Sequence, residues 1–246
     1  MKKEGVKHVF TLSGGHIASI YNACPDYGIN LVDVRHEQAA AHAAAGWARI
    51  TGEPGFCLVT AGPGVTDTVT GVAEAMMADC PMIVFGGRSP LYRNDTGPLQ
   101  DLDQLAFMAP LTKWARAVYQ AERLPEYVAM AFRKAKSPVP SPVYLECAVD
   151  VLDQEVDGEK VFFPENYYTK AEPYGDPKLV RQAADMLMNA ERPVIIAGDG
   201  LFWTGGGSVY SIMLRKCSIL QLNSSNTLHT HQEKSKSFLV QRLLII

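Results

Sequence analysis

The stretch Asp33-Val34-Arg35-His36-Glu37-Gln38-Ala39-Ala40-Ala41-His42-Ala43-Ala44-Ala45-Gly46-Trp47-Ala48-Arg49 decides our prediction of the fold. It overlaps an apolar run, residues 29–34, that is typical of a short buried strand. The alanine-rich segment that follows has a strong helix propensity. Glu37 therefore stands where the carboxyl end of a strand meets the first turn of a helix. In open α/β sheets this is the place where ligands bind.

Glu37 also has a simpler interpretation. An acidic residue in the first turn stabilises a helix by complementing its dipole. Position alone favours this structural role, so a functional role for Glu37 depends on the residues that surround it.

Strand and helix signals alternate outward from this boundary. We expect strands at residues 6–12, 29–34, 55–60, 81–85 and 143–148, and helices at residues 16–23, 37–50, 65–78, 102–109 and 125–135. This order predicts an α/β fold with a parallel sheet flanked by helices. Right-handed crossovers place all turns from strand to helix at one edge of such a sheet. We therefore expect three distant segments to converge there: Ser13-Gly14-Gly15, His36-Glu37 and Gly62-Pro63-Gly64.

The chain beyond this sheet divides by composition. We predict a first domain over residues 1–152 and an acidic, aromatic linker over 153–176. Residues 177–207 begin a second α/β domain with one helix and one strand, which cannot bury a core alone. Residues 208–246 lack a strand–turn–helix rhythm, and we expect an anomalous, poorly ordered tail, such as a frame-shifted or mis-spliced end.

Charge and cysteine usage exclude several classes of protein. The net charge of −3 leaves no electrostatic footprint for nucleic acid. We expect no signal peptide, and no apolar run is long enough to span a bilayer. Five scattered cysteines without a C-x-x-C pair indicate reduced thiols and no zinc site. We expect a cytoplasmic protein that binds neither nucleic acid nor membranes.

Four segments carry a family resemblance when taken together, although each alone is an ordinary turn or loop. They are Phe10-Thr11-Leu12-Ser13-Gly14-Gly15-His16-Ile17, Arg35-His36-Glu37-Gln38-Ala39-Ala40, Thr60-Ala61-Gly62-Pro63-Gly64-Val65-Thr66-Asp67, and Gly97-Pro98-Leu99-Gln100 through Thr112-Lys113-Trp114. In this order and spacing they resemble the N-terminal, pyrimidine-binding domain of thiamine-diphosphate enzymes. The resemblance covers about residues 4–207 and is strongest to the acetolactate synthase large-subunit branch.

The resemblance implies roles for individual residues. Glu37 matches the glutamate that exchanges a proton with the cofactor's aminopyrimidine ring, and Gln100 matches a catalytic-site glutamine that faces the substrate. The matching cofactor-binding residues are Gly14, Gly15, Glu37, Thr60, Gly62, Pro63 and Gly64. Two positions depart from the family pattern, since Ser13 replaces a frequent proline and Asp67 a frequent asparagine. His16 and His42 are interpreted as structural residues, and Lys113 is either a residue near the active-site mouth or a surface residue.

The resemblance implies that this chain holds only the pyrimidine end of thiamine diphosphate. Mg²⁺ and the diphosphate belong to a third, C-terminal domain, so we predict no metal ligand in this chain. Gly198-Asp199-Gly200 with Asn223 and Asn226 superficially matches the metal signature, but the asparagines are not adjacent. FAD is an optional cofactor of this branch. A homo-oligomer, dimer or tetramer, is implied, with helix 37–50 at the dimer interface.

The implied reaction is decarboxylation of a 2-keto acid such as pyruvate, followed by transfer of the two-carbon unit to a second keto acid. Three alternatives stay open: a 2-hydroxyacyl-CoA lyase, a keto-acid decarboxylase, and a catalytically silent truncated subunit that pairs with an intact one. The sequence supports a dinucleotide-binding domain only weakly, because the glycine spacing of Gly198-Asp199-Gly200 is wrong for one.

Overall fold

A computed structural model describes residues 1–168, 174–191, 194–198, 200–205 and 220–223. The chain divides into two units, Met1–Ala171 and Glu172–Ile246. Each unit is described by itself below.

The first unit is built on a six-stranded sheet with the order β2-β1-β3-β4-β6-β5, and every neighbouring pair is parallel. Its strands are β1 His8–Leu12, β2 Asn30–Asp33, β3 Gly55–Val59, β4 Met82–Arg88, β5 Ala115–Val118 and β6 Pro142–Ala148. In the register, Phe10 of β1 lies beside Val32 of β2 and Cys57 of β3. The predicted parallel sheet is confirmed.

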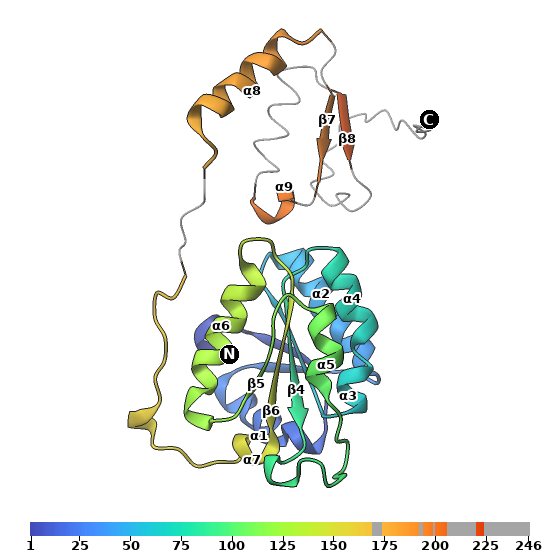
Figure 1. Cartoon of the computed structure of the whole chain (residues 1–246), viewed down its shortest axis with the longest axis vertical. Coiled ribbons are helices and arrows are strands. Elements are labelled where there is room, and N and C mark those ends of the chain that lie inside the picture. The colour runs from blue at the N-terminus through green and yellow to red at the C-terminus, as the bar shows by residue number, and fades with distance from the viewer. Residues whose placement is uncertain (169–173, 192–193, 199, 206–219, 224–246) are drawn as a thin grey trace. The chain divides into compact units, whose positions relative to one another are not determined.

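Helices cover both faces of this sheet, with α6 on one face and α2 and α4 on the other (Figure 1). The helices of the unit are α1 Ala18–Ala23, α2 Glu37–Thr51, α3 Pro63–Thr66, α4 Val69–Met77, α5 Gln104–Met108, α6 Leu124–Lys136 and α7 Val149–Leu152. Short 3-10 turns stand at η1 Lys2–Glu4, η2 Gly15–Ile17, η3 Pro25–Tyr27, η4 Leu91–Arg93, η5 Ala109–Leu111, η6 Ala121–Arg123 and η7 Gly158–Lys160.

Small residues let α2 lie directly on its neighbours. Ala40, Ala44 and Ala48 of α2 have no exposed surface. A Cβ on Gly55 of β3 would lie 2.0 Å from the carbonyl oxygen of Ala44, and a Cβ on Gly71 of α4 would lie 2.7 Å from the Cβ of Ala41. The alanine face of α2 therefore packs within the unit and fixes the position of the helix start, where Glu37 lies.

Two expected helices have other bounds in the structure. The helix expected at 65–78 consists of α3 and α4, with a break at Asp67 and Thr68. The helix expected at 102–109 begins only at Gln104, because Asp103 caps it by accepting a hydrogen bond from the amide of Ala106. Strand β5, at the edge of the sheet, is an additional strand that is not among the five expected ones.

The second unit contains α8 Pro177–Asn189, β7 Val194–Ala197, α9 Gly200–Trp203 and β8 Leu220–Asn223. The expected helix and strand are present. Strand β8 pairs in parallel with β7 and was missed in the sequence, where residues 208–246 show no such pattern. The rest of that tail, and Asp199 and Asn226 of the rejected metal signature, lie outside the described residues.

None of the helices in the described ranges is long and apolar enough to cross a membrane.

Candidate functional site

The strand order reverses between β1 and β3, and we call the region bounded by the turns at the carboxyl ends of β1, β2 and β3 the crevice. The chain moves outward from β1 to β2 and then returns across β1 to β3, so the strand order reverses between β1 and β3. In doubly wound sheets, ligands bind outside the carboxyl ends of the strands at this reversal. The turns after β1, β2 and β3 contain Gly14, Glu37 and Gly62, respectively.

These three turns meet, as predicted. A Cβ on Gly14 would lie 2.4 Å from the Cβ of Thr60, so the turn after β1 lies directly on the turn after β3. A Cβ on Gly64 would lie 2.8 Å from Cγ2 of Thr60 and 3.5 Å from Oε1 of Glu37. Thr60 is buried at the centre of this contact. Glycine is needed at 14 and 64 because a side chain would occupy the space that Thr60 fills.

Glu37 is the first residue of α2, and Oε1 of its carboxylate lies beside Gly64 in the turn after β3. His36 caps the helix, since its Nδ1 accepts a hydrogen bond of 3.2 Å from the amide of Gln38. Glu37 is 9% exposed. Within the described part of the chain, its carboxylate accepts no hydrogen bond. Burial raises the pKa of the Cys57 thiol, and the negative charge of Glu37 raises it further.

Gln100 lies on the loop that follows β4 and borders the same crevice. Its φ is +61°, a left-handed conformation that non-glycine residues rarely adopt. A Cβ on Gly62 would lie 2.8 Å from the carbonyl oxygen of Gln100, so the loop and the turn are in direct contact. The Ser89 hydroxyl donates a hydrogen bond of 2.9 Å to the Leu99 carbonyl and holds the loop beside β4.

His16 joins this group, although its sequence interpretation was structural. It lies in η2, and its Nδ1 is 3.3 Å from Oγ1 of Thr60. Burial lowers the pKa of His16, while a side-chain hydrogen bond with Gln100 acts in the opposite direction. Burial therefore favours the neutral imidazole of His16, which lies against Thr60. Its neighbour Gly15 has open space on its Cβ side, with no atom within 4 Å.

Lys113 lies at the opposite edge of the sheet, just before β5. Its Nζ donates to the carbonyl oxygens of Ser137 and Val139, at 2.7 Å and 2.5 Å. Of the two interpretations of Lys113, the structure supports the one in which it is a surface residue.

One trio of potential metal ligands occurs among the described residues: His36, Glu37 and Asp67, whose ligand atoms lie within 4.8 Å of one another. His36 and Asp67 are exposed, and Nε2 of His36 is 3.8 Å from Oδ2 of Asp67. Such exposed groups are common without an ion, and we assign no metal to them.

Sequence reasoning missed Gln104, which lies behind the crevice. It is 1% exposed, and its side-chain oxygen accepts a hydrogen bond of 2.6 Å from the amide of Gly62. No signal in a single sequence separates Gln104 from an ordinary first-turn residue of α5.

Comparison with known proteins gives this geometry a context. The family described as "Thiamine pyrophosphate enzyme, N-terminal TPP binding domain" matches residues 1–107. This range contains the three turns, Gln100 and Gln104.

Curated relatives extend the similarity beyond that range. The chain is 37% identical over 204 residues to the acetolactate synthase large subunit IlvG of Mycobacterium tuberculosis, covering 82% of this chain and 37% of the relative. It is 38% identical over 208 residues to a probable acetolactate synthase large subunit of Methanocaldococcus jannaschii, covering 83% and 35%. It is 42% identical over 166 residues to 2-hydroxyacyl-CoA lyase 2 of Danio rerio, covering 68% and 27%. The chain thus spans between about a quarter and little more than a third of the length of these relatives.

Proposed function

Because residues 1–107 belong to the family of thiamine pyrophosphate enzymes, as their N-terminal TPP binding domain, we propose that the crevice between β1 and β3 holds the aminopyrimidine ring of thiamine diphosphate. One observation carries the proposal: the Glu37 carboxylate lies where the turns after β2 and β3 meet, and it accepts no hydrogen bond within the described chain. The fully buried polar atoms that lack a partner do not include its oxygens, so the carboxylate is open to a ligand. A ring that donates a hydrogen bond to Glu37 would satisfy it.

The surrounding residues fit such a ring. Gly14 and Gly64 bring the turns together around Thr60, and Gly15 leaves open space beside them. Gly62 and Pro63 shape the turn after β3, in which Pro63 starts α3. Thiamine diphosphate supplies carbanion chemistry when bound. The chain's part in that chemistry is to orient the ring and exclude water, and to exchange a proton at the Glu37 carboxylate.

Gln100 and His16 form the side of the crevice that we assign to the substrate. His16 lies beside Thr60 and shares a side-chain hydrogen bond with Gln100. A neutral imidazole and a carboxamide can each donate and accept hydrogen bonds. This suits a small polar substrate such as a 2-keto acid.

We further propose that the chain supplies the N-terminal part of a carboligating enzyme that decarboxylates a 2-keto acid, as the names of the acetolactate synthase relatives suggest. We propose that Mg²⁺, the diphosphate and any FAD are held outside the matched residues 1–107, and that the 246 residues alone are inactive. The proposal includes a homo-oligomer, dimer or tetramer, and a cytoplasmic location. Four described cysteines, Cys24, Cys57, Cys80 and Cys147, are buried free thiols, as expected of a reducing compartment.

A second candidate activity is 2-hydroxyacyl-CoA cleavage. It is favoured by the 42% identity to the zebrafish 2-hydroxyacyl-CoA lyase 2, although that match covers less of this chain. Mixing the chain with an intact subunit from each branch, then assaying pyruvate decarboxylation and 2-hydroxyacyl-CoA cleavage, separates the two. The same mixtures test whether the chain is a silent partner.

Thiamine itself tests the pyrimidine site, since it carries the ring without the diphosphate. We expect ¹⁵N-labelled chain to show saturable shifts at the amides of Gly14, Glu37 and Gly64, with a dissociation constant on the order of 1 mM, or about −4 kcal/mol. Glu37→Gln should weaken binding about tenfold, whereas Glu53→Gln, at an exposed ion pair with Lys136, should not. Unsaturable shifts, or equal binding by both variants, would refute the site.

A further inference from the structure

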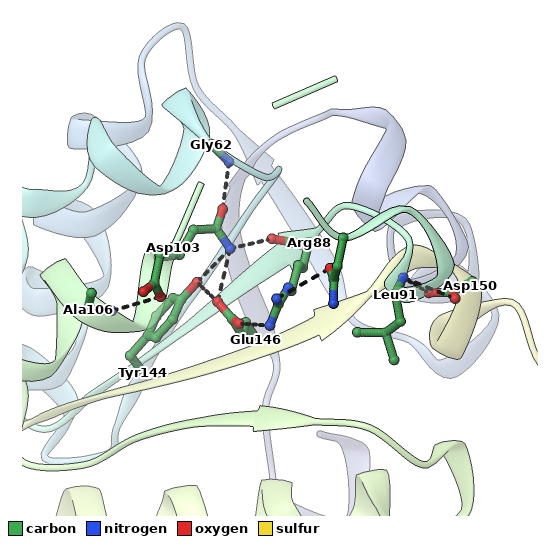
Figure 2. Close-up of polar contacts among 11 residues, drawn as sticks. Gly62, Arg88, Leu91, Asp103, Ala106, Tyr144, Glu146 and Asp150 are labelled. Atoms are coloured by element: carbon green, nitrogen blue, oxygen red, sulfur yellow. Dashed lines mark hydrogen bonds and ion pairs between the residues drawn. The ribbon is translucent and has the colours of Figure 1, made fainter. Parts of the chain in front are cut away.

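The buried amide of Gln104 has every hydrogen-bonding group in use. Oε1 accepts from the Gly62 amide at 2.6 Å. Nε2 lies 2.9 Å from the Gly87 carbonyl oxygen, 3.1 Å from the Tyr144 hydroxyl and 3.0 Å from Oε2 of Glu146. Figure 2 shows these contacts where Gly62, Tyr144 and Glu146 come together. A side chain with 1% exposure thus joins the turn after β3 to strands β4 and β6.

The chemistry of the partners permits only one orientation of this amide. The Gly87 carbonyl is an acceptor. The Tyr144 hydroxyl donates its proton to Oε2 of Glu146 at 3.0 Å, so its lone pairs face Gln104. Burial, and then the nearby Glu146, raise the pKa of Tyr144, which keeps that proton in place. Only Gly62 offers a donor, and therefore the oxygen of Gln104 must face Gly62.

An ion pair with Arg88 anchors the acceptor Glu146. Nη1 of Arg88 donates to Oε1 of Glu146 at 3.0 Å, and Glu146 is 1% exposed (Figure 2). A counter-charge of this kind offsets the cost of burying a carboxylate. The Arg88–Glu146 pair thus fixes the direction in which Gln104 points.

Both backbones held by Gln104 touch residues of the crevice. Gly62 has φ +58° and ψ −113°, a conformation open to glycine, and lies against the backbone of Gln100. On the other side, a Cβ on Gly87 would lie 2.6 Å from the Cβ of His16. Displacement of the Gln104 amide would therefore move the supports of Gln100 and His16 together.

We propose that Gln104 is a positioning residue, which locks the Gly62 turn and Gly87 so that Gln100 and His16 border the crevice in a fixed geometry. The expected effect of Gln104 on ligand affinity rests on the proposed thiamine site. Gln104 itself lies behind the turn and touches neither Glu37 nor open space.

The test uses the full ¹⁵N-labelled chain and the exchange rate of the Gly62 amide. Gln104→Leu removes the acceptor, and we expect Gly62 to exchange at least about tenfold faster, with altered amide shifts at Gln100 and weaker thiamine binding. Tenfold corresponds to about 1.4 kcal/mol, the scale of one buried hydrogen bond. Met108→Ala is the matched control, because Met108 is fully buried in the same helix and would lower stability without touching Gly62.

A conservative variant distinguishes loss of the hydrogen bond to Gly62 from misfolding. Gln104→Glu retains an oxygen that can accept from Gly62, and a protonated carboxyl can still donate to Glu146. We expect the Gly62 amide to stay protected in this variant and to lose protection in Gln104→Leu.

Three results separate the inference from the thiamine proposal. Equal protection of Gly62 in Gln104→Leu and Met108→Ala would overturn the inference. If the Gly62 amide loses protection while thiamine affinity is unchanged, Gln104 does not position the ligand site. If wild type binds no thiamine, the proposed function fails, while the Gly62 exchange rate and the Gln100 shifts still decide the role of Gln104.

Discussion

The adjacent glycines Gly14 and Gly15 provide a sharp test of the geometry, because the same substitution should have different effects at the two positions. A Cβ on Gly14 would lie 2.4 Å, 2.6 Å and 2.8 Å from Cβ, Oγ1 and Cγ2 of Thr60. A Cβ on Gly15 would meet no atom within 4 Å. Neither residue has a positive φ, so backbone strain does not separate them.

The expected magnitudes follow from this packing. Overpacking a buried site costs about 1–3 kcal/mol. Replacing glycine by alanine at a compatible backbone returns about 0.4–1 kcal/mol through the unfolded chain. Gly14→Ala should therefore lower the free energy of unfolding by roughly 1–2 kcal/mol, and Gly15→Ala should leave it unchanged or raise it by up to about 1 kcal/mol.

Urea unfolding of the two variants beside wild type, followed by circular dichroism, measures the difference as a shift of the midpoint at constant slope. In a thermal scan, Gly14→Ala should lower Tm by roughly 2–8 °C for a unit of this size. If Gly14→Ala is as stable as Gly15→Ala, the turns after β1 and β3 do not meet as described, and the crevice built on them is wrong.

Three other predictions concern charged and ionisable groups. Arg88→Met leaves Glu146 buried without a counter-charge and should lower the free energy of unfolding by about 3 kcal/mol in urea. Burial raises the pKa of Cys80 to about 11 and that of Cys147 to about 12, so iodoacetamide at pH 8 should label neither in the folded chain, as mass spectrometry would show. The thiols of the unfolded chain ionise near pH 9, whereas these two folded thiols do not. The free energy of unfolding should therefore fall above pH 9, by up to about 1.4 kcal/mol per pH unit for each thiol. Burial lowers the pKa of His16, so its imidazole should titrate by NMR with a midpoint below 6.5, and its contribution to stability should be lost as the pH falls below that value.

The local order of strands, turns and helices was accessible from the sequence. Alternating apolar runs and an alanine-rich helix are short-range signals, and the rule for right-handed crossovers converts them into a parallel sheet with its turns at one edge. The convergence of Gly14, Glu37 and Gly62 followed from this and is confirmed. The assignment of these residues to a pyrimidine ring came from the family resemblance and stays a proposal.

Short helices and edge elements were harder to predict. The break at Asp67–Thr68 divides α3 from α4 without a proline or glycine to mark it. Strand β8 has four residues in a polar segment, and its pairing with β7 explains the strand better than its own composition does. Such elements depend on contacts that are distant in sequence, which no local window contains.

The sequence by itself determined the fold class and the meeting of the three turns, because periodicity and chain direction are local properties that chirality extends to the whole sheet. Only the tertiary structure decided which of two adjacent glycines is crowded, that His16 belongs to the crevice, and that Gln104 supports it from behind. The physical reason is that hydrogen bonds and van der Waals contacts join residues 40 or more positions apart, as between Gln104 and Gly62 or Thr60 and His16. Their strength depends on distances of a few tenths of an ångström, which are set when the whole sheet packs.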